Sequence, residues 1–131
     1  MPLLSESRFP AISPDGRWVA AYRRRPGPGL WEIVIVPATG GDPVSLGDLP
    51  INPSFPLRWT SDGRSVSFTC QQRGIVSNIC IVPREGGPAR QITSFTDAQI
   101  GSHDWSPAGR LLVVRNRTAS DLIMITLRDK Q

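Results

Sequence analysis

A turn motif that recurs at a fixed spacing constrains the fold of this chain more than any other feature. The motif begins at residues 12, 59 and 105, in Ile12-Ser-Pro-Asp-Gly-Arg17, Trp59-Thr-Ser-Asp-Gly-Arg64 and Trp105-Ser-Pro-Ala-Gly-Arg110, which gives spacings of 47 and 46 residues. The apolar runs Ile33-Val-Ile-Val-Pro37 and Ile79-Cys-Ile-Val-Pro83 are also 46 residues apart. Fixed periods in this range are typical of propellers, solenoids and other repeat arrays.

Each repeat reads as strands joined by tight turns. Within the motif, Pro presets φ for a type I turn, Asp tolerates the next position, and Gly accepts the left-handed backbone that returns the chain. Ser61 replaces the proline in the second copy and Ala108 replaces the aspartate in the third, but the glycine is present in all three. The later strand of each repeat is apolar at every position, so it needs cover on both faces, which neighbouring sheets of a propeller supply.

We therefore predict an all-β chain that forms a β-propeller fragment. It has about three four-stranded antiparallel blades, at about residues 9–46, 57–93 and 103–126. No Gly-Gly turn follows Ile125, so the last blade is predicted to lack its outer strand. A length of 131 residues, with 39% hydrophobic and 20% charged residues, fits one folded domain of this kind.

The motifs also carry a resemblance to a known family. The Trp59 to Arg64 turn, the apolar third strand, Gly86-Gly87 and Arg90-Gln-Ile-Thr93 together resemble the TolB-like (WD-repeat-like) β-propeller blade. The resemblance covers about Phe9 to Thr126. Thr118-Ala-Ser-Asp-Leu-Ile-Met-Ile125 is further similar to the last blades of propellers at the C-terminal end of bacterial signalling proteins. Those proteins carry a serine/threonine kinase or winged-helix domain, and neither domain is present in this sequence.

The residues offer no catalytic arrangement. His103 is the single histidine and stands next to Asp104. Adjacent residues of a strand point to opposite faces, so this pair cannot act as a base and its orienting carboxylate. The sequence contains no Gly-x-Ser-x-Gly elbow, which argues against an α/β-hydrolase domain within it. We predict that His103 is an ordinary strand residue, that there are no catalytic residues and that the chain is not an enzyme.

Metal and cofactor sites are not predicted either. Cys70 and Cys80, with one histidine in another blade, cannot complete a zinc site. The acidic residues are scattered and form no Asp-x-Asp-x-Asp run for calcium. The two cysteines fall on neighbouring strands. A cross-strand disulfide in an oxidising compartment is one alternative, and buried free thiols are the one that we favour.

The net charge of +4 comes almost entirely from arginine. The cluster Arg23-Arg24-Arg25, with Trp31 beside it, is our candidate for partner binding, through phosphates or an acidic partner. The alternative is a solvated loop. A nucleic-acid ligand is not expected, because it would need a longer basic surface with stacking aromatic residues. Trp59 and Trp105 recur at the repeat period and are predicted to pack between blades.

These features predict a non-enzymatic β-propeller interaction or sensor module, in the C-terminal part of a larger bacterial signalling protein. Its partner would be a protein, the remaining propeller blades or a small ligand, and uncovered sheet faces favour self-association. The alternative is the propeller portion of a larger enzyme, a serine/threonine kinase or a prolyl-oligopeptidase-like hydrolase. No apolar run has membrane-spanning length and no signal peptide opens the sequence. A cytoplasmic location is therefore expected, with the periplasm as the alternative for a longer chain.

Overall fold

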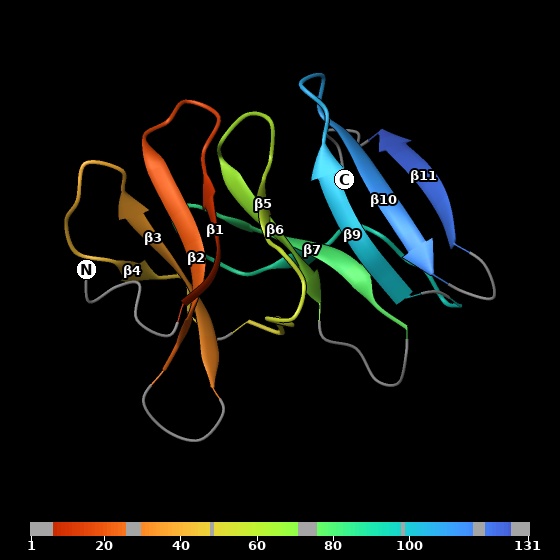
Figure 1. Cartoon of the computed structure of the whole chain (residues 1–131), viewed down its shortest axis with the longest axis horizontal. Coiled ribbons are helices and arrows are strands. Elements are labelled where there is room, and N and C mark those ends of the chain that lie inside the picture. The colour runs from red at the N-terminus through yellow and green to blue at the C-terminus, as the bar shows by residue number, and fades with distance from the viewer. Residues whose placement is uncertain are drawn as a thin grey trace.

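Three antiparallel sheets lie side by side along the chain (Figure 1). The computed structural model describes residues 7–25, 30–47, 49–70, 76–97, 99–116 and 120–126. The strands of the first sheet are β1 Ser7–Ile12, β2 Trp18–Arg24, β3 Trp31–Pro37 and β4 Val44–Ser45. Those of the second sheet are β5 Arg58–Trp59, β6 Ser65–Cys70, β7 Asn78–Pro83 and β8 Arg90–Gln91. The third sheet contains β9 Gln99–Trp105, β10 Arg110–Asn116 and β11 Ser120–Thr126.

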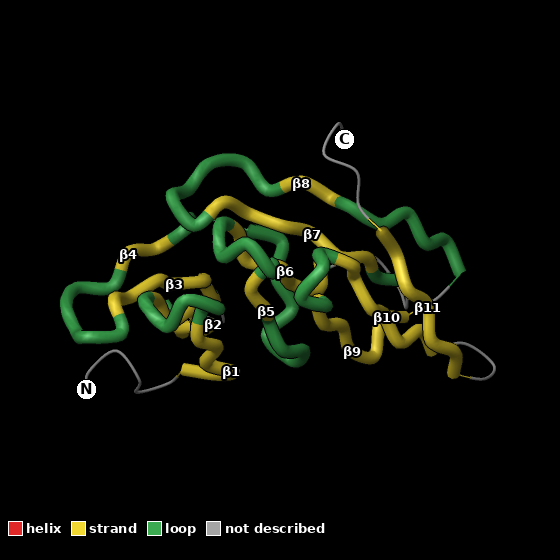
Figure 2. Tube along the Cα trace, turned by 90° about the horizontal axis from the view of Figure 1, so that it is seen from above, coloured by secondary structure: helices red, strands yellow, loops and turns green. Residues whose placement is uncertain are grey.

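Each sheet runs from an inner to an outer strand in chain order. The first strands β1, β5 and β9 lie along one side of the molecule, and β4 and β8 lie along the opposite side (Figure 2). In the described ranges no strand pairs with the outer edge of β11, and none of the elements is a helix, so none could span a membrane as one. The predicted all-β class, with a last sheet one strand short, is confirmed.

Apolar side chains fill the two boundaries between the sheets. Ile33 and Ile35 of β3 pack with Val66 and Phe68 of β6 in the larger core. Ile79 of β7 faces the other way and joins Leu111 and Val113 of β10 in a second core. Strand β7 therefore contributes to both boundaries, because its alternate residues point to opposite faces. This explains why the third strand of a repeat is apolar at every position.

The repeated turns differ in length for a reason visible in the sequence. The carboxylate of Asp15 accepts a hydrogen bond from the backbone N–H of Arg17 (3.0 Å), and Asp62 accepts one from that of Arg64 (3.0 Å). These bonds hold an extra residue in the first two turns. The third turn has Ala108 at this position and no carboxylate to accept such a bond.

The backbone hydrogen bonds that close the turns show this difference in length. Ser13 N–H donates to the carbonyl five residues ahead, that of Trp18, whereas Ser106 N–H donates to that of Arg110, four residues ahead. The turn glycine has a positive φ in all three copies, with values of 76°, 72° and 86°. Sequence reasoning correctly placed these glycines but did not predict the shorter third turn.

Cys70 and Cys80 form a disulfide, which corrects the expectation of free thiols. Cys80 pairs with Phe68 across β6 and β7, so Cys70, two residues further along β6, is its diagonal neighbour on the same face. The two Cα atoms are 5.7 Å apart, within the range that a disulfide bridges. Both residues are buried in the core between the first and second sheets. The disulfide thus ties the two central strands of the second sheet together.

Candidate functional site: a groove at the ends of the inner strands

A groove of about 390 Å³ lies where the three inner strands end. Strands β1, β5 and β9 each contribute their last two residues, and the turn that follows each strand forms the rim. The groove is therefore lined by the same two repeat positions in each of the three sheets. The strand residues that line it are Ala11 and Ile12, Arg58 and Trp59, and Asp104 and Trp105.

The tryptophans fix this groove because each is bonded to the preceding sheet. Trp59 Nε1 donates a hydrogen bond to the carbonyl of Ala11 (2.8 Å), and Trp105 Nε1 donates one to Ser67 Oγ (2.8 Å). The predicted packing of these two indoles between sheets is confirmed. At the same repeat position of the first sheet, Ile12 is 62% exposed and adds an apolar side chain to the groove.

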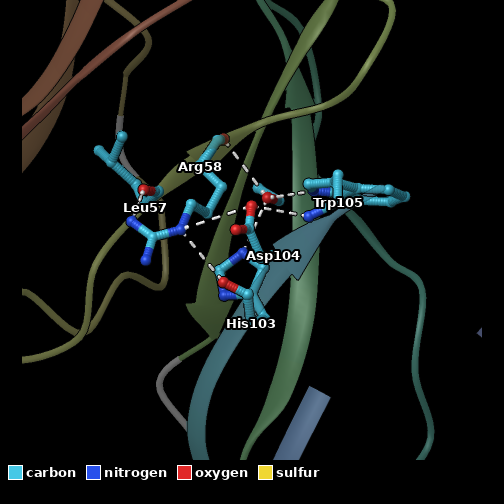
Figure 3. Close-up of polar contacts among 6 residues, drawn as sticks. Leu57, Arg58, His103, Asp104 and Trp105 are labelled. Atoms are coloured by element: carbon cyan, nitrogen blue, oxygen red, sulfur yellow. Dashed lines mark hydrogen bonds and ion pairs between the residues drawn. The ribbon is translucent and has the colours of Figure 1, made fainter. Parts of the chain in front are cut away.

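Arg58 and Asp104 supply one positive and one negative group to the groove. Arg58 Nε donates to the carbonyl of His103 (3.2 Å) and Nη1 donates to that of Leu57 (3.3 Å), as Figure 3 shows. The Asp104 carboxylate lies 3.8 Å from Arg58 Nε, and the two side chains are 68% and 37% exposed, respectively. An exposed pair at this distance is weak. Both charges therefore remain available to a ligand.

His103 and Ser67 meet behind the groove, at the boundary of the second and third sheets. Ser67 Oγ lies 2.8 Å from His103 Nε2, and both side chains are buried. The pKa of His103 is lowered to about 4, and burial is the largest cause. The positive charge of Arg58 also lowers this pKa, and the negative charge of Asp104 raises it by a smaller amount. The imidazole is therefore neutral at pH 7. The contact between the serine and the histidine is buried, and the indole of Trp105 also bonds to the same hydroxyl.

The predicted basic cluster does not form one patch. Arg23 and Arg24 belong to β2 rather than to a loop. Arg23 lies opposite Glu32 and forms an ion pair with it, with Nη2 and Oε2 2.7 Å apart. Because strand residues alternate between faces, Arg24 lies on the other face of the sheet from Arg23, and it pairs with Trp31 across the hairpin. Arg25 follows the end of the strand. The expectation of one basic loop is corrected, because the alternation of β2 and a carboxylate across the hairpin divide the cluster.

The environment of Glu32 shows how firmly Arg23 is held. Burial alone would raise the pKa of Glu32, but hydrogen bonds from Ser45 and Arg23 outweigh it and lower the pKa below its usual value. Trp31 is also engaged, since the guanidinium of Arg8 lies 4.7 Å from the centroid of its ring. Arg23 and Trp31 therefore make contacts within the first sheet, and binding of a partner at these residues stays a prediction.

Sequence reasoning missed the groove, although the repeat contained the signal for it. When the three copies are aligned on their turns, Ala11, Arg58 and Asp104 share one position, and only there does the residue change from apolar to cationic to anionic. A position that departs from its repeat in this way is a candidate for function. No group of three or more His, Cys, Asp or Glu side chains capable of holding a metal ion occurs in the described part of the chain.

Comparison with known proteins supports the fold and gives a first indication of context. No family model matches the chain. It is 28% identical over 108 residues to a tricorn protease homolog of Streptomyces coelicolor, covering 82% of this chain but only 8% of that protein. TolB from Acinetobacter baumannii has a TM-score of 0.67 and 21% identity, over 88% of this chain and 28% of that one. The β-propeller domain of the trilobed protease from Pyrococcus furiosus has a TM-score of 0.56 and 19% identity, over 92% and 38%.

Proposed function

Because the chain folds as part of a TolB-like β-propeller, we propose that it is a non-enzymatic interaction module of a larger bacterial signalling protein. The observation that carries this proposal is the groove at the ends of the inner strands. It combines two fixed indoles with the adjacent charges of Arg58 and Asp104. Trp and Arg are the side chains most enriched among the residues that dominate binding energy at protein interfaces.

The chemistry of the groove favours a polypeptide over a nucleic acid or a free anion. Asp104 is 68% exposed and lies beside Arg58, so it would repel a phosphate that approached the guanidinium. A peptide offers backbone amides and apolar side chains, and it can place a carboxylate near Arg58 and an amine near Asp104. The volume of about 390 Å³ is large enough for a few side chains of such a segment.

A non-enzymatic role is supported by the position of the groups that could otherwise react. Ser67 is 0% exposed and His103 is 4% exposed, so their contact lies within the boundary between two sheets. Nucleophilic catalysis would need the serine oxygen to reach a substrate. We therefore expect the chain to hydrolyse neither esters nor peptides.

The test is to select binders and then remove the groove charges. Peptides from a random decapeptide display library would be selected on the folded chain, and their affinities measured by fluorescence anisotropy. Arg58→Ala and Asp104→Ala should each weaken the selected peptides at least tenfold. Arg90→Ala is the matched control, because Arg90 lies exposed on outer strand β8, away from the groove. Binders that are indifferent to both groove variants would refute the proposal.

A second candidate function is the propeller portion of a larger enzyme. The similarity to a tricorn protease homolog and to the trilobed protease propeller favours a peptidase, while the kinase alternative is supported only by the sequence resemblance. In this case the groove would contact substrates on their way to a catalytic domain outside this sequence. The adjoining coding sequence decides between the two candidates. An in-frame peptidase domain supports the second, and a winged-helix domain supports the first.

The disulfide indicates in which cellular compartment the chain is located. A structural disulfide such as Cys70–Cys80 persists in oxidising compartments and is rare in the cytosol. We therefore propose an extracytoplasmic location in place of the cytoplasmic one expected from the sequence. Cell fractionation followed by mass spectrometry of the two cysteines would test this. Recovery of the chain from the cytosol with both thiols reduced would refute it.

A further inference from the structure

Arginine side chains cover two of the four tryptophan rings of the chain. The guanidinium of Arg84, at the end of β7, lies 4.8 Å from the centroid of the Trp18 ring, across the boundary between the second and first sheets. That of Arg8 lies 4.7 Å from the centroid of the Trp31 ring. A guanidinium over an aromatic ring is attracted by the negative face of the ring. This fold therefore uses arginine repeatedly to cover an indole.

The two tryptophans that line the groove have no such cover from the described residues. Trp59 is only 6% exposed and needs none, but Trp105 is half-buried, so part of its ring remains open in the groove. The indole N–H of Trp105 is already used, because it donates to Ser67 Oγ. A ligand that contacts this indole therefore meets its ring and not an unused donor.

Asp104, the neighbour of Trp105 on β9, presents a carboxylate to the same groove. Its Oδ1 accepts a hydrogen bond from the backbone N–H of Trp105 (2.8 Å), which orients the carboxylate. Its Oδ2 has no hydrogen-bond partner in the described part of the chain, and the side chain is 68% exposed. An open carboxylate oxygen and an uncovered ring thus lie in one groove.

We propose that this groove binds an arginine side chain of a partner polypeptide, with the guanidinium over the ring of Trp105 and paired with Asp104 Oδ2. The inference rests on the proposed peptide-binding role of the groove and names the side chain that the groove selects. A guanidinium suits both groups, because it is planar, stacks on aromatic rings and donates several N–H groups in one plane to a carboxylate. Its aliphatic stem packs on Ile12, which is 62% exposed and also lines the groove.

The charge of Arg58 is compatible with a second guanidinium at Asp104. Arg58 Nε and Nη1 donate to the backbone carbonyls of His103 and Leu57, so this side chain is directed toward the chain itself (Figure 3). Its contact with Asp104 is to Oδ1, at 3.8 Å. An ionised carboxylate has about four lone-pair sites on its two oxygens. The ligand therefore pairs with the oxygen that Arg58 does not approach.

Decapeptides selected on the folded chain from a random display library provide the probe, and fluorescence anisotropy measures their affinities. The selected peptides should share an arginine. Replacement of this arginine by citrulline, which keeps the shape but removes the charge, should weaken binding at least tenfold. Replacement by lysine should weaken it at least threefold, because an ammonium group neither stacks as a plane nor pairs in a fork. Both replacements leave the protein unchanged.

Asp104→Asn tests the other half of the proposed contact. Asparagine keeps an oxygen that can accept from Trp105 N–H but removes the negative charge. On this variant the arginine and citrulline peptides should differ less than twofold, because the two groups interact directly and their effects are not additive. Asp42→Asn is the matched control, since Asp42 is exposed in a loop and does not line the groove. The control should retain the tenfold difference.

The outcomes separate this inference from the proposed function. Selected peptides that weaken with Arg58→Ala and Asp104→Ala, but lack arginine or tolerate citrulline, would overturn the arginine site and leave the peptide-binding role intact. Equal affinity of the lysine peptide would overturn the assignment to a guanidinium. A citrulline effect of the same size on the Asp104→Asn chain would also overturn the site, since the guanidinium would then lie elsewhere. Binders indifferent to every groove variant would overturn both proposals.

Discussion

Trp105 donates its indole N–H to Ser67 Oγ at 2.8 Å, across the boundary between the second and third sheets. The same oxygen lies 2.8 Å from His103 Nε2. One buried hydroxyl of β6 therefore joins two side chains of β9, whose Trp105 also lines the groove. This connects the packing of the sheets to the shape of the proposed binding site.

Removal of this hydroxyl should destabilise the chain. Ser67→Ala leaves the indole N–H and the imidazole nitrogen without a partner, which should lower the free energy of unfolding by roughly 2–3 kcal/mol. Thr69→Val is the matched control, because Thr69 Oγ1 is buried on the same strand and has no hydrogen-bond partner among the described residues. Loss of the Thr69 hydroxyl should leave the free energy of unfolding unchanged or raise it slightly. Urea denaturation would check both, and equal losses would contradict this account.

The stability of the chain should depend on pH through His103. Its pKa is about 4 in the folded chain, against an ordinary value of 6.5, so the unfolded chain binds the proton more tightly. The contribution of the neutral His103 to the free energy of unfolding is therefore fully present above pH 6.5 and is lost as the pH falls from 6.5 to 4. The free energy of unfolding should decrease by roughly 2 kcal/mol between pH 7 and pH 5. His103→Gln should remove this dependence, because glutamine does not titrate.

Carboxylates act in a lower pH range, so the two effects can be separated. The pKa values of Asp15, Glu32 and Asp62 are lowered in the folded chain. Their contribution is present above the ordinary carboxyl pKa and is lost only as the pH falls below it. Denaturation at pH 7, 6 and 5 thus reports mainly on His103. An unchanged slope in the His103→Gln variant would show that another group is responsible.

The sequence predicted those parts of the fold that depend on one repeat at a time. The apolar strands, the turn glycines and the packing of Trp59 and Trp105 all follow from spacing along the chain. The features that it missed require the register between strands. Arg23 is neutralised by Glu32, nine residues away across a hairpin, and Cys70 meets Cys80 only because their strands place them diagonally.

The groove was harder to predict because three strands must meet before it exists. Ala11, Arg58 and Asp104 are 47 and 46 residues apart, and nothing in the local sequence shows that their strands end together. Only the three-dimensional arrangement of β1, β5 and β9 brings these positions to one groove. Even so, the repeat alignment marks the position as variable, which is a signal that can be sought in other repeat proteins.

Reduction of the Cys70–Cys80 disulfide should weaken the second sheet. The cross-link closes a short loop between β6 and β7, at a sequence separation of 10 residues. Loss of this constraint on the unfolded chain should cost roughly 2–3 kcal/mol. Denaturation with and without dithiothreitol would measure the loss, and a Cys70→Ala/Cys80→Ala chain should be insensitive to the reductant. If a chain purified without reductant and then unfolded showed two thiols that react with a thiol reagent, the disulfide would be absent and its assignment would be contradicted.

The second turn allows the roles of its glycine and its aspartate to be compared. Gly63 has a φ of +72°, and an added Cβ would meet Pro14 Cδ at an ordinary 3.7 Å, so the cost of Gly63→Ala is that of the backbone conformation, roughly 1–2 kcal/mol. Asp62→Ala removes an exposed carboxylate that accepts from Arg64 N–H and from Thr60 Oγ1 (2.7 Å). This substitution should cost roughly 0.5–1 kcal/mol, because exposed hydrogen bonds contribute little.

Asp62→Ala should also change the geometry of that turn. Without the carboxylate, the turn should shorten by one residue to the form found at Ala108, where Ser106 N–H donates four residues ahead rather than five. The new closing bond would then join Thr60 N–H to the carbonyl of Arg64 instead of that of Ser65. Amide exchange and chemical shifts over residues 60–66 would detect the change, and Ala108→Asp should lengthen the third turn in the opposite sense. If the Asp62→Ala turn kept its five-residue closure with unchanged stability, the aspartate would not be what sets the length of the turn.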